Sequence, residues 1–179
     1  MEEGLTLLKR EFHLKEEDTA QYSPLVLAYM GDAVYELMIR TLVVNQGNAQ
    51  VNKLHKRSAG LVKAEAQARM ALALQEDLTE TERAVYRRGR NAKSYTSAKN
   101  ASIRDYRTAT GFEALAGYLY LSGQPERLAE LVRLGLMKLG EVSLAGQEQE
   151  PDGNREPKQN QELRKDRELG QEQEPLDLR

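Results

Sequence analysis

Two stretches of the sequence place single acidic residues among apolar and small ones. Residues 27–37, LAYMGDAVYEL, contain Asp32, and Glu36 follows four residues later. Residues 111–121, GFEALAGYLYL, contain Glu113. A carboxylate in apolar surroundings costs free energy unless something pairs with it. These acids therefore either face water, as most charged side chains do, or bind a cation.

Carboxylates from two helices would form an oxygen-rich site suited to Mg²⁺, which binds few carboxylates and retains waters. Beside a basic surface, such an ion polarises a phosphate and activates water, the arrangement for phosphodiester hydrolysis. The sequence contains no Gly-rich phosphate loop, no HExxH motif and no convincing nucleophile–base pair. We therefore predict a Mg²⁺ site that contains Asp32 and Glu113.

A basic segment lies between the two acids. Residues 83–107 hold eight Lys or Arg against one acid, a local charge of +7 that suits a polyanion. Residues 87–102, RRGRNAKSYTSAKNAS, show no apolar periodicity and are predicted to form an exposed basic loop. A solvated linker is the alternative, although a linker needs no charge of a single sign. The candidate polyanion-binding residues are Arg87, Arg88, Arg90, Asn91, Lys93 and Lys99, with Lys56 and Arg57 on a second basic face.

Helices must position these residues. Ser23 followed by Pro24 predicts the start of a helix to about residue 44, which is apolar on most sides and is expected to be central and buried. We predict further helices over 50–75, with a break at 58–60, from a capping box at Thr79–Glu82 to about 89, over 105–122 and over 125–139. The fold class is all-α.

The chain of 179 residues divides into three predicted parts. Residues 1–20 form an N-terminal arm or short helix, and residues 21–140 form the single catalytic domain. Residues 141–179 are a Gln/Glu/Pro-rich tail, predicted to be disordered because apolar residues nearly vanish there.

Composition excludes several classes of protein. There is no cysteine, which excludes disulfides and thiolate metal sites, and two histidines are too few for a histidine-rich zinc site. No apolar run approaches the ~20 residues that span a bilayer, and the N-terminus does not resemble a signal peptide. A cytoplasmic location and no membrane partner are expected.

Several motifs together resemble the ribonuclease III family. Residues 27–33 (LAYMGDA) resemble its Gly-Asp signature, and FEALAGYLYL, beginning at Phe112, resembles its second catalytic helix. With HKRS at residues 55–58 and RGRNAKS at residues 88–94, the chain is most similar to Mini-ribonuclease III, the compact bacterial branch. The resemblance covers roughly residues 20–138.

The resemblance implies a homodimeric endonuclease that cuts double-stranded RNA with Mg²⁺ in the maturation of large-subunit (23S) ribosomal RNA precursor. A ribosomal protein on that precursor is a further candidate partner. Asp32 and Glu113 match two of the family's four metal-binding carboxylates, whereas Ala28 and Thr110 stand where the other two are expected. Glu36 and Thr110 are candidates for support of the metal ligands. Tyr29 matches the residue that packs into the partner subunit.

The departures from the family pattern leave alternatives open. Ribonuclease III usually carries a separate double-stranded-RNA-binding domain, and the tail lacks the composition for one, so the catalytic domain itself is expected to hold RNA. The two missing carboxylates motivate a second hypothesis, a catalytically silent double-stranded-RNA-binding module. A helical adaptor for an acidic protein is a third.

Overall fold

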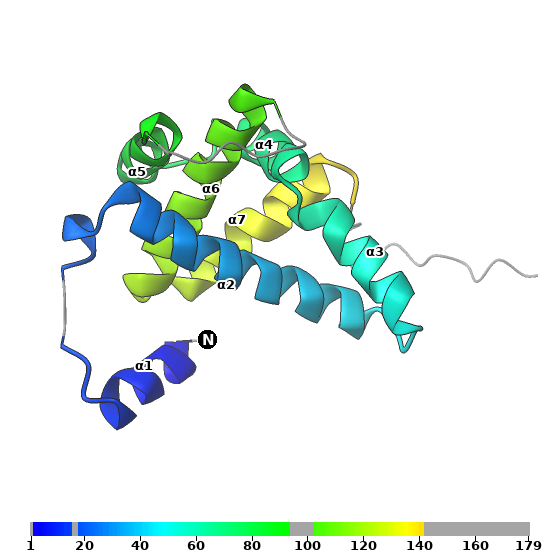
Figure 1. Ribbon diagram of the computed structural model, residues 1–179, viewed down its shortest axis with the longest axis horizontal. Helices are drawn as coiled ribbons and strands as arrows, with labels where there is room; N and C mark the ends of the chain where they lie inside the picture. Colours follow the sequence, from blue (N-terminus) through cyan, green and yellow to red (C-terminus); the bar gives the residue numbers. More distant parts are fainter. Residues whose placement is uncertain (1, 16–17, 94–101, 142–179) are drawn as a thin grey trace, which may run out of the picture. The chain divides into compact units, whose positions relative to one another are not determined.

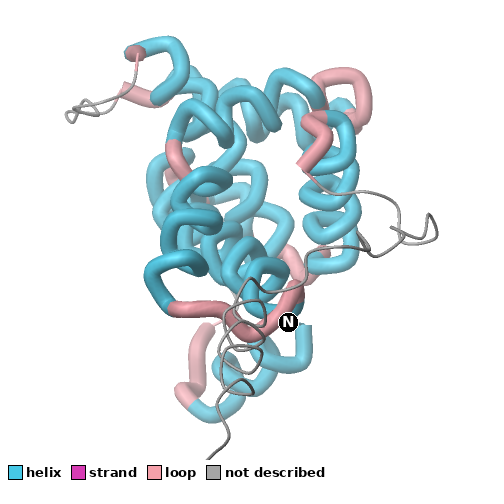
Figure 2. The backbone as a smooth tube through the Cα atoms, turned by 90° about the vertical axis from the view of Figure 1, so that its right-hand side faces the viewer, coloured by secondary structure: helices cyan, strands magenta, loops and turns pink. Residues whose placement is uncertain are grey.

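The computed structural model describes residues 2–15, 18–93 and 102–141, all within one compact unit, Met1–Ser143. Helices and loops account for all of these residues, and none of them lies in a strand (Figures 1 and 2). The all-α prediction is therefore confirmed for the part of the chain that is described. The tail predicted to be disordered, residues 141–179, lies outside that part from residue 142 onward, and so does Lys99 with its predicted role.

The described chain forms α1 (Glu2–Glu11), a 3₁₀ turn (Thr19–Gln21), α2 (Pro24–Asn45), α3 (Val51–Val62), α4 (Ala64–Ala73), α5 (Glu80–Asn91), α6 (Ile103–Leu121) and α7 (Pro125–Lys138). Helix α6 packs against α2, α4, α5 and α7, and is the element around which these four helices are arranged (Figure 1).

Local chemistry starts two helices where the sequence predicts. The Ser23 hydroxyl accepts a hydrogen bond from the Val26 amide at 3.2 Å at the start of α2. At the start of α5, Thr79 Oγ1 accepts from the Glu82 amide at 3.2 Å, and Glu82 Oε2 accepts from the Thr79 amide at 2.8 Å. The predicted capping box is thus confirmed, because each side chain satisfies an amide that the helix leaves free.

Two predicted boundaries are wrong. The break between α3 and α4 lies at the extended residue Lys63, because Ser58 bonds back to the Leu54 carbonyl at 3.0 Å and remains helical. The segment from Arg87 to Asn91 is the end of α5 and not a loop. Its buried side is formed there by Gly89, on which an added Cβ would lie 2.5 Å from the Ala114 Cβ of α6. Because glycine has no apolar side chain, the helical periodicity of apolar residues could not be recognised in this last turn of α5.

The core lies where α2 and α6 cross. An added Cβ on Gly31 would lie 1.8 Å from the Glu113 carbonyl oxygen, and one on Gly117 would lie 2.0 Å from the Leu27 carbonyl oxygen. The two backbones therefore meet through the paired glycines Gly31 and Gly117. Beyond the crossing, the rings of Tyr35 and Phe112 pack edge to face at 5.1 Å between centroids.

The expectation that α2 is buried on most sides is wrong for the single chain. One side of α2 is buried, but the other exposes large apolar side chains at Leu25, Val26, Tyr29, Leu37, Leu42 and Val44. Sequence composition could not separate the two sides, because both carry the same residue types. We call the exposed residues Val26, Tyr29, Ala33 and Leu37, spaced three or four apart, the α2 stripe.

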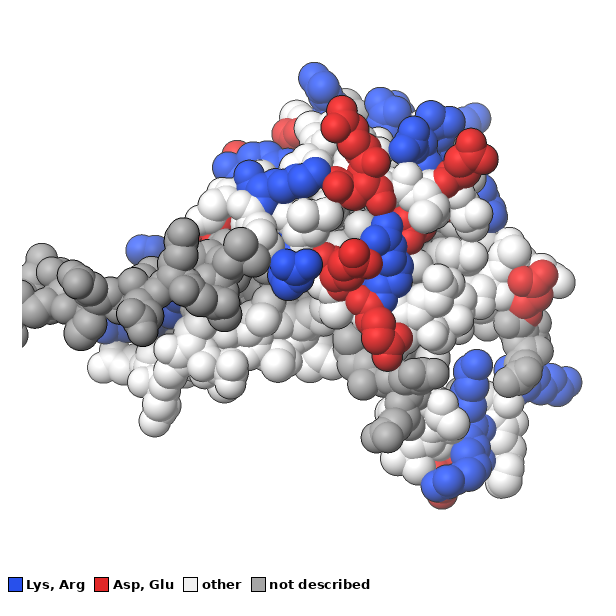
Figure 3. Space-filling view, turned by 180° about the vertical axis from the view of Figure 1, so that it is seen from behind, with Lys and Arg blue, Asp and Glu red and all other residues white. Residues whose placement is uncertain are grey.

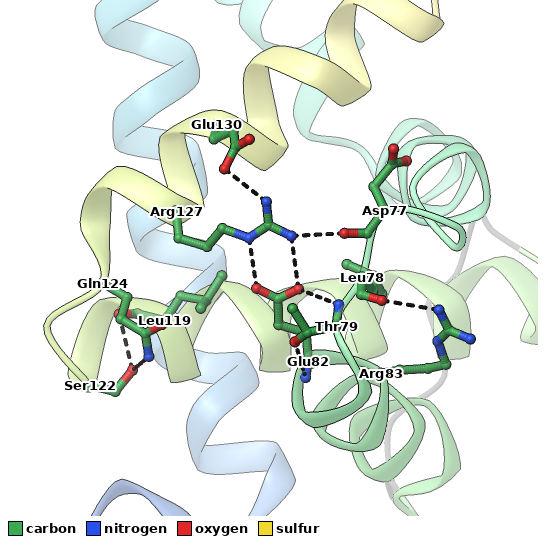
Figure 4. Close-up of polar contacts among 10 residues, drawn as sticks. All are labelled: Asp77, Leu78, Thr79, Glu82, Arg83, Leu119, Ser122, Gln124, Arg127 and Glu130. Carbon is green, nitrogen blue, oxygen red and sulfur yellow. Dashed lines mark hydrogen bonds and ion pairs between the residues drawn. The ribbon is translucent and has the colours of Figure 1, made fainter.

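A nearly buried ion pair ties α7 to the start of α5 (Figure 4). Arg127 Nε donates to Glu82 Oε1 at 2.8 Å, and Arg127 Nη2 donates to Glu82 Oε2 at 3.0 Å and to the Asp77 carbonyl at 2.8 Å. The Glu82 side chain is 6% exposed. Burial alone would raise the pKa of Glu82, but the hydrogen bonds from Arg127 and Thr79 and the charge of Arg127 outweigh it and lower that pKa.

Replacement of Arg127 by Met should lower the free energy of unfolding by about 3 kcal/mol, because it leaves a buried carboxylate without its partner. Since the folded-state pKa of Glu82 is lowered, its contribution is present above the ordinary pKa of a glutamate and is lost as the pH falls below it. Urea unfolding at pH 7 and pH 3 should therefore show a smaller difference between wild type and variant at pH 3. An equal difference at both values would contradict this account of the pair.

Candidate metal centre and RNA-binding surface

The helix crossing brings the two predicted metal ligands together. Asp32 follows Gly31 on α2, and Gly31 lies directly against the backbone of Glu113 on α6. The Asp32 side chain is exposed and that of Glu113 is partly buried. The charge of Asp32 adds to the effect of burial in raising the pKa of Glu113. The site therefore has one acid at the surface and one behind it.

The electrostatics of this pair are unfavourable without a cation. Burial, and then the charge of Asp32, raise the pKa of Glu113 to about 7. Burial, and then the charge of Glu36, raise the pKa of Asp32. A hydrogen bond from the Gln67 side chain acts in the opposite direction on both acids. A divalent cation between the carboxylates would remove the repulsion.

These residues fit a hydrated divalent ion. Within the described residues, no group of three or more His, Cys, Asp or Glu side chains is placed to hold a metal. Ala28 and Thr110, at the positions of the two missing acids, are both buried, and the Thr110 hydroxyl donates to the Tyr106 carbonyl at 2.9 Å. Asp32 and Glu113 would therefore hold the ion with waters in the remaining positions, which Mg²⁺ accepts.

Glu36 lies one turn from Asp32 and has a partner of its own. Arg40 Nε donates to Glu36 Oε1 at 3.1 Å. The pair is partly exposed, and the charge of Glu36 still acts on Asp32. Glu36 is thus placed to influence Asp32 electrostatically.

Gln67 on α4 is a member of this site that sequence analysis missed. Its side chain is buried, and its Nε2 donates to the Val62 carbonyl at 2.9 Å. The sequence feature that could have indicated it is the presence of Gln67 within the alanine-rich run AEAQARMALA. That signal alone does not distinguish a buried polar contact from an exposed surface residue.

The structure gathers some of the predicted RNA-binding residues at the end of α5. Arg87, Arg90 and Asn91 are exposed and, at spacings of three and four, share one helix face. Basic side chains gather at the upper right of Figure 3, over α5, with few acids among them. Arg88 is exposed and its Nη2 donates to the Tyr22 carbonyl at 3.3 Å, while Lys93 is exposed just beyond the helix.

Lys56 and Arg57 form a separate basic surface. Both are exposed on α3, where with Lys53 they line a hollow of about 580 Å³ between α3 and the end of α2. The Arg57 guanidinium donates to Gln46 Oε1. Helices α3 and α5 lie at opposite sides of Figure 1, so the structure does not bring the two predicted basic groups together.

Tyr29 is 81% exposed, in the middle of the α2 stripe. Asp32 and Glu36 follow Tyr29 and Ala33 by three residues, so the carboxylates flank the stripe. A surface that covered the stripe would therefore lie beside the metal site.

Comparison with known proteins identifies the family. The Ribonuclease III domain model matches residues 25–124. A Mini-ribonuclease 3 from Clostridium tetani is 53% identical over 130 residues, covering 70% of this chain and 86% of the relative. One from Enterococcus faecalis is 49% identical over 128 residues, covering 70% and 97%.

A crystal structure of a protein from Fusobacterium nucleatum matches with a TM-score of 0.62 and 28% identity, covering 71% of this chain and all of that one. The matched family region contains Asp32, Glu113 and, except for Pro24, both helices of the crossing. The chain therefore belongs to the ribonuclease III family of double-strand-specific endoribonucleases, in its Mini-ribonuclease 3 branch.

Proposed function

We propose that this enzyme cleaves double-stranded RNA with Mg²⁺ as its cofactor, in the maturation of large-subunit (23S) ribosomal RNA precursor. The observation that carries the metal assignment is the pair Asp32–Glu113 at the helix crossing, where Gly31 lies against the backbone of Glu113. Burial, and then the charge of Asp32, raise the pKa of Glu113 to about 7. The precursor substrate rests on the likeness to the Mini-ribonuclease 3 branch, and a ribosomal protein bound to that precursor is part of the same proposal.

Each residue of the pair has a distinct task in this mechanism. When bound, Mg²⁺ supplies the charge that polarises the scissile phosphate and activates water. Asp32, at the surface, would hold the ion on the side that RNA approaches, while Glu113 would hold it from within. Glu36 adds negative charge beside Asp32, and the Thr110 hydroxyl is held by the Tyr106 carbonyl. We infer that Glu36 and Thr110 support the ligands.

The end of α5 would hold the RNA backbone. Arg87, Arg88, Arg90 and Lys93 present positive charge to phosphates, and Asn91 offers a hydrogen bond in the minor groove. A-form RNA hides its base edges in a deep, narrow major groove, so recognition should rest on backbone shape and 2′-hydroxyls. Lys56 and Arg57 would extend the contact along a longer duplex, and Lys99 is proposed as a further phosphate contact because it belongs to the same basic segment of the sequence as Arg87.

Combining Arg87→Ala with Arg90→Ala should weaken duplex binding for many sequences. Each lost phosphate contact should flatten the plot of log affinity against log salt by roughly one unit, hence about two units for the double variant. Dissociation constants should be measured at several salt concentrations in EDTA, which blocks cleavage. The control is Arg10→Ala with Arg133→Ala, which removes the same charge elsewhere. Equal slopes for wild type and the α5 variant would move the RNA contact to the α3 surface.

We further propose that the enzyme is a two-fold symmetric homodimer that buries the α2 stripe. Each chain supplies one carboxylate pair, whereas duplex RNA has two antiparallel strands whose backbones are related by two-fold axes. A symmetric dimer supplies one site per strand. An exposed apolar stripe that flanks the acids suits an interface beside which both sites would lie.

Wild-type protein should sediment at twice the chain mass of 20.2 kDa at micromolar concentration. Tyr29→Arg with Leu37→Arg should sediment as a monomer, because two cations on the stripe would be desolvated in the interface. Leu72→Arg is the control, since Leu72 is an exposed apolar residue on α4. A monomeric wild type with full cleavage activity would remove the dimer from the proposal.

The silent RNA-binding module remains the second candidate, supported by Ala28 and Thr110 at two carboxylate positions. It predicts duplex binding without cleavage in Mg²⁺.

The proposed location is the cytoplasm, because the expected substrate is a ribosomal RNA precursor. No described helix is long and apolar enough to cross a membrane.

The substrate is tested with a transcript that carries the precursor ends of large-subunit RNA. Its cleavage should be measured with and without ribosomal proteins.

A further inference from the structure

Gln67 is the most deeply buried polar side chain near the carboxylates. It is 1% exposed on α4, between Ala66 and Ala68, which are also buried. Its side chain lies near both acids, since its hydrogen-bonding influence lowers the pKa of Asp32 on α2 and of Glu113 on α6. A buried amide costs free energy unless its donors and acceptor are satisfied. The partners of its amide nitrogen and its amide oxygen therefore indicate its role in the site.

One hydrogen bond fixes the orientation of the amide. Nε2 donates to the Val62 carbonyl at 2.9 Å, at the end of α3. The reversed orientation would place the amide oxygen against that carbonyl, and two acceptors cannot bond to each other. The amide nitrogen has a second proton. The bond to Val62 thus leaves that proton for the carboxylates.

The amide oxygen is left without a donor. Among the described residues, Gln67 Oε1 and Arg83 Nε are the buried side-chain polar atoms that have no hydrogen-bond partner in the protein. A buried acceptor without a donor costs about 1–3 kcal/mol, and a donor from outside the chain would offset that cost. Water molecules around a divalent cation are strong donors, and such a cation is expected at the adjacent carboxylates.

We propose that Gln67 is a positioning residue of the metal site. Its nitrogen holds Asp32 and Glu113 together, and its oxygen accepts a hydrogen bond from the water shell of the cation. Gln67 would thereby supply part of the support that Ala28 and Thr110, at the two missing carboxylate positions, do not supply as ligands. The inference rests on the proposed function, because it requires a cation at Asp32 and Glu113.

The test is calorimetric titration of Mg²⁺ and Mn²⁺ into RNA-free protein, with melting temperatures measured in EDTA. Gln67→Met keeps the length and removes both hydrogen-bonding atoms. The matched control is Gln75→Met, because Gln75 also donates from Nε2 to a backbone carbonyl, that of Ala71 at 2.7 Å. Gln67→Met should reduce metal affinity by about 10–100-fold, the range for residues that orient metal ligands. Gln75→Met should bind metal as wild type does.

Gln67→Asn provides a second arm. It keeps an amide but shortens the side chain by one methylene, which withdraws both hydrogen-bonding atoms from the site, so it should also bind Mg²⁺ more weakly than wild type. Unchanged metal affinity in Gln67→Met, even with a lowered melting temperature, would overturn the inference and leave Gln67 as a cap for Val62. If Gln67→Met does not fold, wild-type Mg²⁺ affinity in Gln67→Asn overturns it. If wild type and Asp32→Asn both bind no metal, the proposed function fails instead.

Discussion

Asp32→Asn is expected to reduce the rate of duplex RNA cleavage by more than about 100-fold. Mutation of residues that only orient metal ligands already lowers metal affinity or activity by about 10–100-fold, and Asp32 is proposed as a ligand itself. The amide keeps the shape of the side chain and removes the charge that would hold the cation. Duplex affinity in EDTA should not fall, because the basic residues of α5 are unchanged. Single-turnover rates at saturating protein separate the two effects.

Asp32→Asn should also change how the stability of metal-free protein depends on pH. The folded-state pKa of Glu113 is raised to about 7, so metal-free protein should lose stability as the pH rises from about 4.5 through 7. Asp32→Asn removes a charge that contributes to this shift and should lessen the loss. Glu126→Gln, an exposed acid on α7, is the control for both measurements. Near-wild-type cleavage by Asp32→Asn would show that the cation is held elsewhere.

Gly31→Ala is expected to lower the free energy of unfolding by about 3 kcal/mol or more, at the upper end of the range for overpacking a core. The added methyl would lie 1.8 Å from the Glu113 carbonyl oxygen and 2.6 Å from the Gly117 amide nitrogen. Both are backbone atoms, so no side-chain rotation can relieve the overlap, and α2 and α6 must separate. Separation also moves Asp32 from Glu113, so metal affinity should fall with stability.

Gly60→Ala is the matched control in α3. A methyl group there meets nothing within 4 Å, and the gain in helix propensity should raise stability by up to about 1 kcal/mol. Urea unfolding of both variants with wild type measures the contrast. A Gly31→Ala protein as stable as wild type would mean that the crossing has room for a side chain, and the account of how the acids are brought together would fail.

Sequence predicted the features of this fold that depend on local chemistry. The cap at Ser23 and the box at Thr79–Glu82 need only residues close in sequence, and both appear as predicted. The end of α5 was predicted wrongly as a loop, because the buried position there is Gly89, which packs against α6 without a side chain. A contact of that kind depends on a helix distant in sequence.

The site divides in the same way. The single acids in two apolar runs predicted that Asp32 and Glu113 would share a site. The sequence did not show that Gly31 would bring the two backbones together, because that contact depends on how α2 and α6 cross. Gln67 could not be recognised from the sequence, since its significance depends on the burial of α4 against the crossing. The exposure of the α2 stripe also could not be predicted, because composition does not show which side of an apolar helix meets its own core.

The most direct test of the central claim is the fate of an end-labelled RNA duplex with purified wild-type protein in Mg²⁺, in EDTA, and in EDTA followed by excess Mg²⁺. We expect discrete internal cleavage in Mg²⁺, intact but bound duplex in EDTA, and recovery of cleavage when Mg²⁺ is restored. Asp32→Asn and Glu113→Gln in parallel should bind the duplex and leave it intact. Duplex that is bound but uncut by wild type in Mg²⁺ would contradict the nuclease assignment and favour the silent RNA-binding module.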